Sequence, residues 1–178
     1  MPSARTWLIA SRPKTLFAAA APVLIGTAMA IEAGQFHAVS AVLCLLGALL
    51  IQVGTNFHND VADFEKGVDS ADRKGPVRAT AAGLATVYEM KRATVVVFAM
   101  AVIAGAYLMW RGGLPIVIIG VLSIVFGVLY TASKYSLSSL GVADFFVFIF
   151  FGPVAVGGTY YVQSLTLTPD VILAGVAP

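Results

Sequence analysis

Long runs of apolar residues, separated by short polar stretches, fill most of this sequence. A helix that crosses a bilayer needs about 20 mostly apolar residues. Four runs approach that length, at residues 16–33, 38–57, 94–110 and 114–132. Because lipid offers no partner for free backbone groups, helices are the expected form of such runs.

A fifth apolar run covers about 142–162 and contains Gly152 and Pro153, which allow a kink. Near the end of the sequence, Thr168 and Pro169 are typical of a helix start, and only a short apolar run follows. That run covers about half a bilayer, so we expect the sequence to be a fragment that ends within a span. The predicted fold is all-α, a polytopic transmembrane helix bundle with about five spans.

The composition agrees with a bilayer environment. Hydrophobic residues make up 59% of the 178 residues and charged residues only 11%, whereas soluble domains carry about 25% charge. Mean hydropathy is +0.90. The basic residues form no stripe and no nucleic-acid motif is present, so the predicted partner is a lipid bilayer and not a nucleic acid.

The basic residues predict the orientation in the membrane. If the N-terminus is cytoplasmic, every lysine and arginine except Arg111 faces the cytoplasm. The cytoplasmic set is Arg5, Arg12, Lys14, Lys66, Arg73, Lys74, Arg78, Lys91, Arg92 and Lys134. We therefore expect a multi-pass protein of the cell (inner) membrane.

Five of the nine carboxylates lie between Asp60 and Asp72, at the cytoplasmic end of the second run. If that run continues as a helix, four polar side chains share one face, at i, i+3, i+4 and i+7. They are Asn56, Asn59, Asp60 and Asp63. Gly67 is predicted to end the helix, and Asp69 follows on a loop that could fold back toward Asp63.

Clustered carboxylates are tolerated when cations lie between them. Hard oxygen ligands suit Mg²⁺, which often binds one or two carboxylates together with substrate phosphates. Arg73 and Arg78 follow, and arginine matches phosphate oxygens bidentately. This pattern indicates a site for a diphosphate on a lipid tail. The alternative is a solvated loop whose charges only set topology.

These residues also carry a family resemblance. Asn59-Asp60-x-x-Asp63, Gly67-x-Asp69 and Arg73-x-Gly75-Pro76-x-Arg78 together resemble the first Asp-rich motif of the UbiA superfamily of intramembrane aromatic prenyltransferases. The spacing from Asp63 to Asp69 is similar to that of the branch that prenylates 1,4-dihydroxy-2-naphthoate for menaquinone. Arg12-Pro13-Lys14-Thr15-Leu16 is similar to that branch's N-terminal signature, whereas Asp144 stands where the branch commonly has Glu.

The resemblance implies transfer of a prenyl group from a polyprenyl diphosphate to an aromatic quinone precursor, with Mg²⁺ as cofactor. The implied catalytic residues are Asn59, Asp63 and Asp69. The implied metal ligands are Asn59, Asp60, Asp63 and Asp69. The implied substrate-binding residues are Asn56, Arg73, Arg78, Tyr130 and Lys134. Residues 1–178 then form one prenyltransferase domain, expected to stop before the family's second Asp-rich motif.

Other functions remain open at this point. Sibling enzymes that prenylate homogentisate, haem or chlorophyll precursors share the resemblance. A cation-coupled transporter would place acids near span centres and repeat the segment, and the sequence shows neither. A noncatalytic membrane scaffold is the third alternative.

Overall fold

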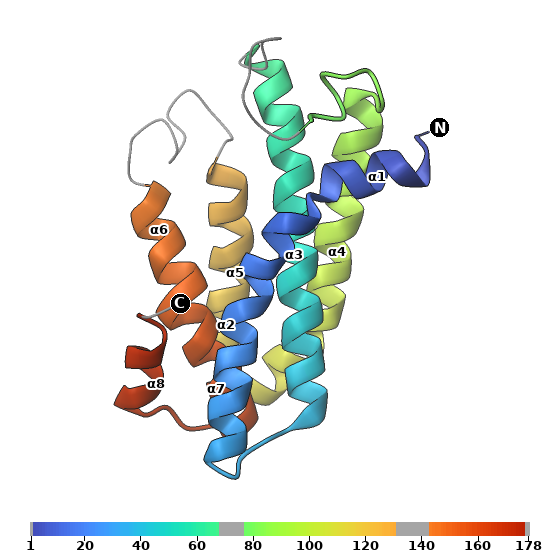
Figure 1. Cartoon of the computed structure of the whole chain (residues 1–178). Coiled ribbons are helices and arrows are strands. Elements are labelled where there is room, and N and C mark those ends of the chain that lie inside the picture. The colour runs from blue at the N-terminus through green and yellow to red at the C-terminus, as the bar shows by residue number, and fades with distance from the viewer. Residues whose placement is uncertain (1, 68–76, 131–142, 177–178) are drawn as a thin grey trace.

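The computed structural model describes residues 2–67, 77–130 and 143–176. Within these ranges the chain forms helices and turns and no strands, as Figure 1 shows. The elements are α1 (Ala4–Ser11), α2 (Pro13–Glu32), α3 (Ala38–Glu65), α4 (Val87–Gly112), α5 (Leu114–Leu129), α6 (Ala143–Ile149), the π-helix η1 (Phe150–Val154), α7 (Ala155–Ser164) and α8 (Pro169–Ala174). The prediction of an all-α bundle is confirmed.

The predicted spans are confirmed as helices, with some ends shifted. Four helical segments are long and apolar enough to cross a membrane, and α5 is a shorter apolar helix. The four are Pro13–Glu32, Ala38–Glu65, Val87–Gly112 and Asp144–Ser164. α4 begins at Val87 and not at residue 94, because Thr86 and Glu89 form a capping box ahead of the apolar run.

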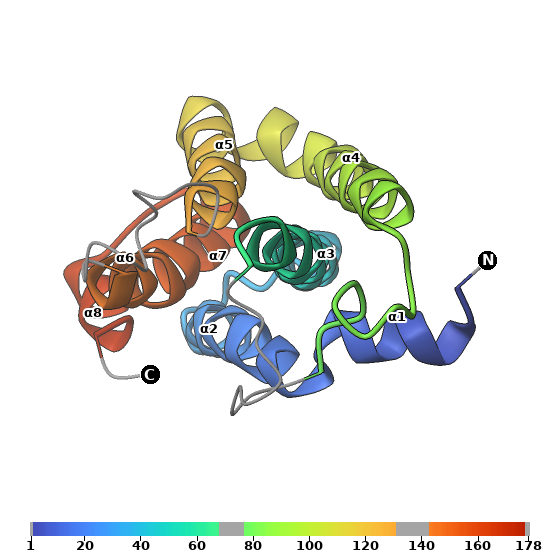
Figure 2. The same ribbon diagram turned by 90° about the horizontal axis from the view of Figure 1, so that it is seen from above.

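α3 lies in the middle of the bundle. It contacts α1, α2, α4, α5 and α7, and Figure 2 shows it between α2 and α4. Its 28 residues rise about 42 Å at 1.5 Å per residue, whereas the hydrocarbon core of a bilayer is about 30 Å thick. The polar C-terminal end of α3 therefore extends beyond the apolar section of the bundle.

The kink predicted in the fifth run is confirmed. Gly152 has non-helical angles of φ −103° and ψ −111° where α6 passes through η1 into α7. A Cβ atom at Gly152 would collide with the carbonyl oxygen of Gly175, just after α8. The predicted start at Thr168 and Pro169 is also confirmed, because α8 begins there. Close packing of α8 on the kink thus depends on the missing side chain at Gly152.

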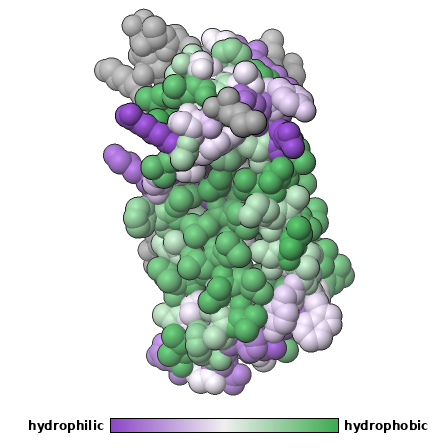
Figure 3. Space-filling view, turned by 90° about the vertical axis from the view of Figure 1, so that its right-hand side faces the viewer, coloured by the Kyte–Doolittle hydropathy of each residue, from purple (hydrophilic) through white to green (hydrophobic). Residues whose placement is uncertain are grey.

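The outer surface suits a bilayer. Figure 3 shows an apolar band around the middle of one face, with polar side chains gathered at the two ends. Many large apolar side chains are exposed along α2 to α5, among them Leu24, Val42, Ile103 and Val121. Such a surface is favourable in lipid and would be a large exposed apolar patch in water.

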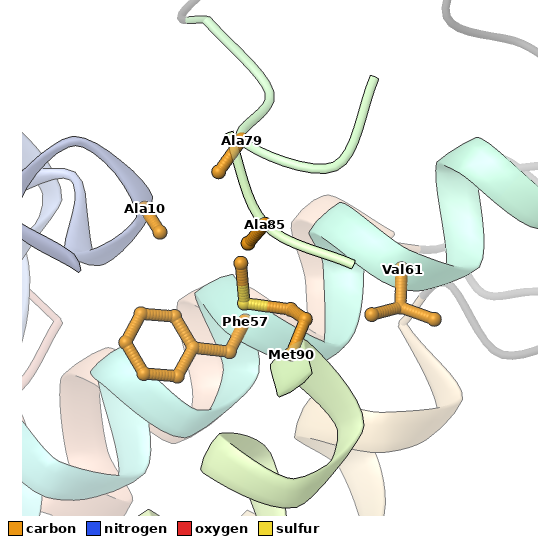
Figure 4. Packing of buried hydrophobic residues seen from close by; sticks show 6 residues of the cluster. All are labelled: Ala10, Phe57, Val61, Ala79, Ala85 and Met90. Carbon is orange, nitrogen blue, oxygen red and sulfur yellow. The ribbon is translucent and has the colours of Figure 1, made fainter. Parts of the chain in front are cut away.

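One small apolar cluster fixes the polar end of α3 to its neighbours. Phe57 and Val61 of α3 pack with Ala10 of α1, Met90 of α4, and Ala79 and Ala85 of the segment before α4 (Figure 4). Met90 and Ala79 are fully buried. The cluster therefore holds the segment that follows residue 76 against the end of α3.

Hydrogen bonds lock the opposite end of the bundle. Arg111, at the end of α4, donates from Nε to the carbonyl of Val162 (2.8 Å) and from a terminal nitrogen to the carbonyl of Gln163 (3.1 Å). Gln163 in turn accepts from the backbone N–H of His37 at the start of α3 (3.3 Å). These contacts tie α3, α4 and α7 together far from the acidic segment.

Candidate functional site

The four polar residues predicted to share a face of α3 do lie on that helix, and in the structure their side chains are buried. Asn56, Asn59, Asp60 and Asp63 all belong to α3 and all are buried. α3 runs through Glu65, and Gly67 follows in the left-handed conformation (φ 66°) that glycine tolerates. A buried carboxylate is costly without partners, so the contacts of the two aspartates decide what each can do.

Asp63 forms an ion pair with Arg78, which is also buried. Both residues were predicted as site residues, one as a metal ligand and the other as a diphosphate contact. In this structure they neutralise one another, because the segment that carries Arg78 is packed against the end of α3. Removing either partner would leave the other charge in a buried position, which is strongly destabilising.

Asp60 holds the backbone of that same segment. One carboxylate oxygen accepts from the N–H of Ala79 at 2.8 Å, and the other accepts from the N–H of Thr80 at 2.9 Å. The side chain is almost completely buried. Asp60 therefore has a structural contact that the sequence pattern did not reveal, since backbone donors carry no residue-type signal.

Asn56 belongs to a hydrogen-bonded group that joins α3 to the start of α2. Its Nδ2 donates to the carbonyl of Ser11 (2.8 Å) and to Oγ1 of Thr15 (2.9 Å). Gln52, one turn earlier on α3, donates from Nε2 to Oδ1 of Asn56 (3.3 Å) and to Oγ1 of Thr15 (3.4 Å). Asn56 thus contacts the α1–α2 junction directly.

A cavity of about 950 Å³ lies among the helices beside these residues. The two charged residues and most of the polar residues that line it lie toward the end where α3 finishes: Arg12, Thr15, Gln52, Thr55, Asn56, Asn59, Tyr130 and Asp144. Ser123 of α5 and Thr159 of α7 also line it. The remaining lining is mostly apolar and comes from α2 to α7, for example Ile51, Leu108 and Phe150. Such a cavity can hold a long apolar group with a polar or charged head at the α3 end.

Only some of the predicted site residues therefore line the cavity. Asn56, Asn59 and Tyr130 line the cavity, whereas Asp63 and Arg78 lie buried at the end of α3 outside its lining. Asp69, Arg73 and Lys134 lie outside the described residues. Within the described ranges, no group of three or more His, Cys, Asp or Glu side chains is arranged to hold a metal ion.

Arg12, Thr15 and Gln52 are polar lining residues that the sequence predictions did not include in the site. Gln52 could have been found, because it precedes Asn56 by one helical turn and extends the same polar face. In the sequence, Arg12 and Thr15 belong to an N-terminal signature, and Arg12 is also one of the predicted cytoplasmic cations. Nothing in their spacing shows that the start of α2 lies beside the end of α3.

Comparison with known proteins decides the family. Residues 19–178 match the sequence model of the UbiA prenyltransferase family. The chain belongs to the UbiA prenyltransferase family. Family membership and four membrane-length helices together make it a multi-pass membrane protein.

Several relatives of this chain are named 1,4-dihydroxy-2-naphthoate octaprenyltransferase, and three of them are described here. The protein of Escherichia coli strain K12 is 36% identical over 97% of this chain and 58% of its own length. The Haemophilus influenzae protein is 32% identical over the same shares. The Mycobacterium tuberculosis protein is 36% identical over 93% of this chain and 56% of its own length. The UbiA chain thus spans less than two thirds of these relatives.

Proposed function

We propose that the full-length protein transfers a polyprenyl group from a polyprenyl diphosphate to 1,4-dihydroxy-2-naphthoate, as a step of menaquinone biosynthesis. The observation that carries this proposal is the largely apolar cavity whose charged residues and most of whose polar residues lie toward the C-terminal end of α3, where Asn59 belongs to the lining. Relatives at 32–36% identity that are named for this reaction support the choice of acceptor.

The apolar and polar parts of the cavity lining suit different parts of the two substrates. An isoprenoid tail is apolar and lies in the bilayer, so an apolar lining can accept it from lipid, whereas exposing it to water would cost about 25 cal/mol for each Å². Apolar side chains such as Ile51 and Phe150 supply that environment. The diphosphate and the aromatic carboxylate need hydrogen-bond donors and cations, and the lining supplies these at the opposite end of the cavity, including Arg12 and Tyr130.

The donor set at the end of α3 fits a magnesium ion that is shared with a substrate. Asn59 and Asp63 offer an amide oxygen and a carboxylate one turn apart, and Mg²⁺ typically takes one or two carboxylates plus phosphates and water. We propose these two as ligands, together with Asp69. Asp60 is left out, because both of its oxygens already accept backbone hydrogen bonds. When bound, Mg²⁺ would stabilise the negative charge that develops on the diphosphate.

Arg78 is the cation that pairs with Asp63. In the proposal it exchanges Asp63 for a phosphate oxygen when the diphosphate arrives, so that a buried charge always has a partner. Arg73 and Lys134 are proposed as further diphosphate contacts, and Tyr130, which lines the cavity, as a contact of the aromatic acceptor.

The orientation follows from charge. At the end of the bundle where α3 finishes, Lys14 lies in the first turn of α2, Arg78 precedes α4, and Lys91 and Arg92 lie near the start of α4. Arg111 lies at the other end of α4. By the positive-inside rule we propose that the site faces the cytoplasm from the inner membrane.

The test uses membranes that carry the full-length protein, incubated with a labelled polyprenyl diphosphate. We expect a prenylated product with 1,4-dihydroxy-2-naphthoate, a much smaller yield with 4-hydroxybenzoate, and loss of product when EDTA removes divalent ions. Absence of product with every aromatic acceptor would overturn the prenyl-transfer proposal. A product formed equally well in EDTA would overturn the metal assignment.

A further inference from the structure

The backbone of Arg12 adopts an unusual conformation where α1 ends and α2 begins. Its angles are φ 50° and ψ 72°, the left-handed region that side-chain-bearing residues seldom occupy. Such a residue persists only where its surroundings hold it there. Arg12 is half-buried and lines the cavity.

The peptide groups around Arg12 are held from both sides. The carbonyl of Ser11 accepts from Nδ2 of Asn56 at 2.8 Å. The carbonyl of Arg12 itself accepts from the backbone N–H of Thr15 and from its Oγ1, each at 2.9 Å. Asn56 belongs to α3, so a residue distant in sequence helps to hold this left-handed turn.

Gln52 fixes the direction of the Asn56 amide. Because Gln52 donates to Oδ1 of Asn56, the Nδ2 group of Asn56 must face the opposite way, toward Ser11 and Thr15. Thr15, Gln52 and Asn56 form one connected group, named here the junction network. All three line the same cavity as Arg12.

We propose that the junction network is a positioning device for Arg12. Asn56, oriented by Gln52, holds the left-handed turn so that the Arg12 guanidinium stands at the polar end of the cavity and binds an anionic group of a substrate. A guanidinium matches paired anionic oxygens bidentately, and both a diphosphate and an aromatic carboxylate present them. The inference rests on the proposed function, and it makes Asn56 a positioning residue that need not touch substrate.

The test is a double-mutant cycle in the full-length protein. Asn56→Leu keeps the approximate side-chain volume and removes the hydrogen bonds, and Arg12→Ala removes the guanidinium. We expect each variant to raise KM for one substrate by about 10- to 100-fold, the effect of losing a charged hydrogen bond. The double variant should be no worse than Arg12→Ala alone, because the network acts through Arg12. Effects that multiply would overturn the proposal, since a direct substrate contact of Asn56 would be independent.

Two substrate arms identify the anion. A raised KM for the polyprenyl diphosphate alone assigns Arg12 to the diphosphate, and a raised KM for dihydroxynaphthoate alone assigns it to the carboxylate. Thr15→Val is the second variant, for use if Asn56→Leu loses the wild-type gel-filtration profile in detergent. Gln163→Leu is the matched control, because it also removes hydrogen bonds from a buried amide but lies at the opposite end of the bundle. It should leave both KM values unchanged.

A binding measurement tests the role of Arg12 and Asn56 independently of whether the protein transfers a prenyl group. Calorimetry with inorganic pyrophosphate and with 2-naphthoate needs no turnover, so it reads the Arg12 site even if the wild type makes no prenylated product. We expect Asn56→Leu to weaken one of the two probes by about tenfold or more. Unchanged affinity for both probes, or no affinity in the wild type, would overturn the positioning role. If the wild type is active and the Asn56→Leu variant keeps wild-type KM values, the positioning role is overturned and the proposed function is not.

Discussion

Asp60→Asn tests whether this carboxylate holds the backbone of the segment before α4. In the wild type the two oxygens accept from the N–H groups of Ala79 and Thr80, and the residue is 1% exposed. The substitution replaces one oxygen with an NH₂ group, so one buried backbone N–H loses its acceptor and faces another donor. The expected result is local opening of residues 77–80.

The size of the effect follows from that single lost acceptor. A buried donor without a partner costs about 1–3 kcal/mol. A cost of about 2 kcal/mol makes the open state about 30-fold more populated, because each 1.4 kcal/mol is a factor of ten. Protection of the Ala79 and Thr80 amides against hydrogen exchange should then fall by about the same factor.

Hydrogen exchange followed by mass spectrometry, on metal-free protein in detergent, measures this directly. Glu65→Gln is the control, because it makes the same chemical change near the end of α3. The Glu65 side chain is 49% exposed and pairs with Lys91, 57% exposed, at 2.6 Å, and exposed ion pairs contribute only about 0–1 kcal/mol. Unchanged protection of residues 77–80 in Asp60→Asn, or equal losses in both variants, would refute the reasoning.

Two further predictions concern stability. Arg111→Ala removes two donors to carbonyls at the end of α7. We therefore expect the free energy of unfolding to fall by about 1–3 kcal/mol, with a lower thermal midpoint in detergent. Arg92 is exposed, so Arg92→Ala should leave the midpoint unchanged, and equal midpoints in the two variants would contradict this. Gly26→Ala places a Cβ atom 2.5 Å from the carbonyl oxygen of Val156, so overpacking should cost about 1–3 kcal/mol. Gly105→Ala, with no neighbouring atom within 4 Å, should be neutral or stabilising in the same melt, and a stable Gly26→Ala would contradict the packing argument.

The spans and the polar face of α3 were predictable because both depend on local periodicity. Apolar runs of membrane length gave the helices, and the spacing of Asn56, Asn59, Asp60 and Asp63 gave one face. α1 was missed because it is too short to appear as a span, although Ser3 is a recognisable N-cap.

The contacts of the site could not be predicted in the same way. Asp60 accepts from backbone N–H groups some 20 residues later, and backbone donors leave no mark on a sequence. Arg78 was predicted to contact a phosphate, and in the structure it pairs with Asp63. The sequence shows that the residue is a cation, but it does not show which anion it pairs with. The left-handed turn at Arg12 is held by Asn56 of another helix, which is a tertiary effect.

The rate of prenyl transfer in Asp63→Asn, measured beside Glu65→Gln, tests the central claim most directly. Both variants replace a carboxylate with an amide on α3, but only Asp63 is buried beside Arg78 on the polar face. Rates are compared per amount of protein that keeps the wild-type gel-filtration profile in detergent, because loss of the buried pair also destabilises the fold. We expect the full-length Asp63→Asn protein to make product at least about a hundredfold more slowly, as when a preorganised electrostatic contact is lost, and Glu65→Gln to match the wild type. Wild-type rates in Asp63→Asn would contradict the assignment of this end of α3 as the diphosphate site.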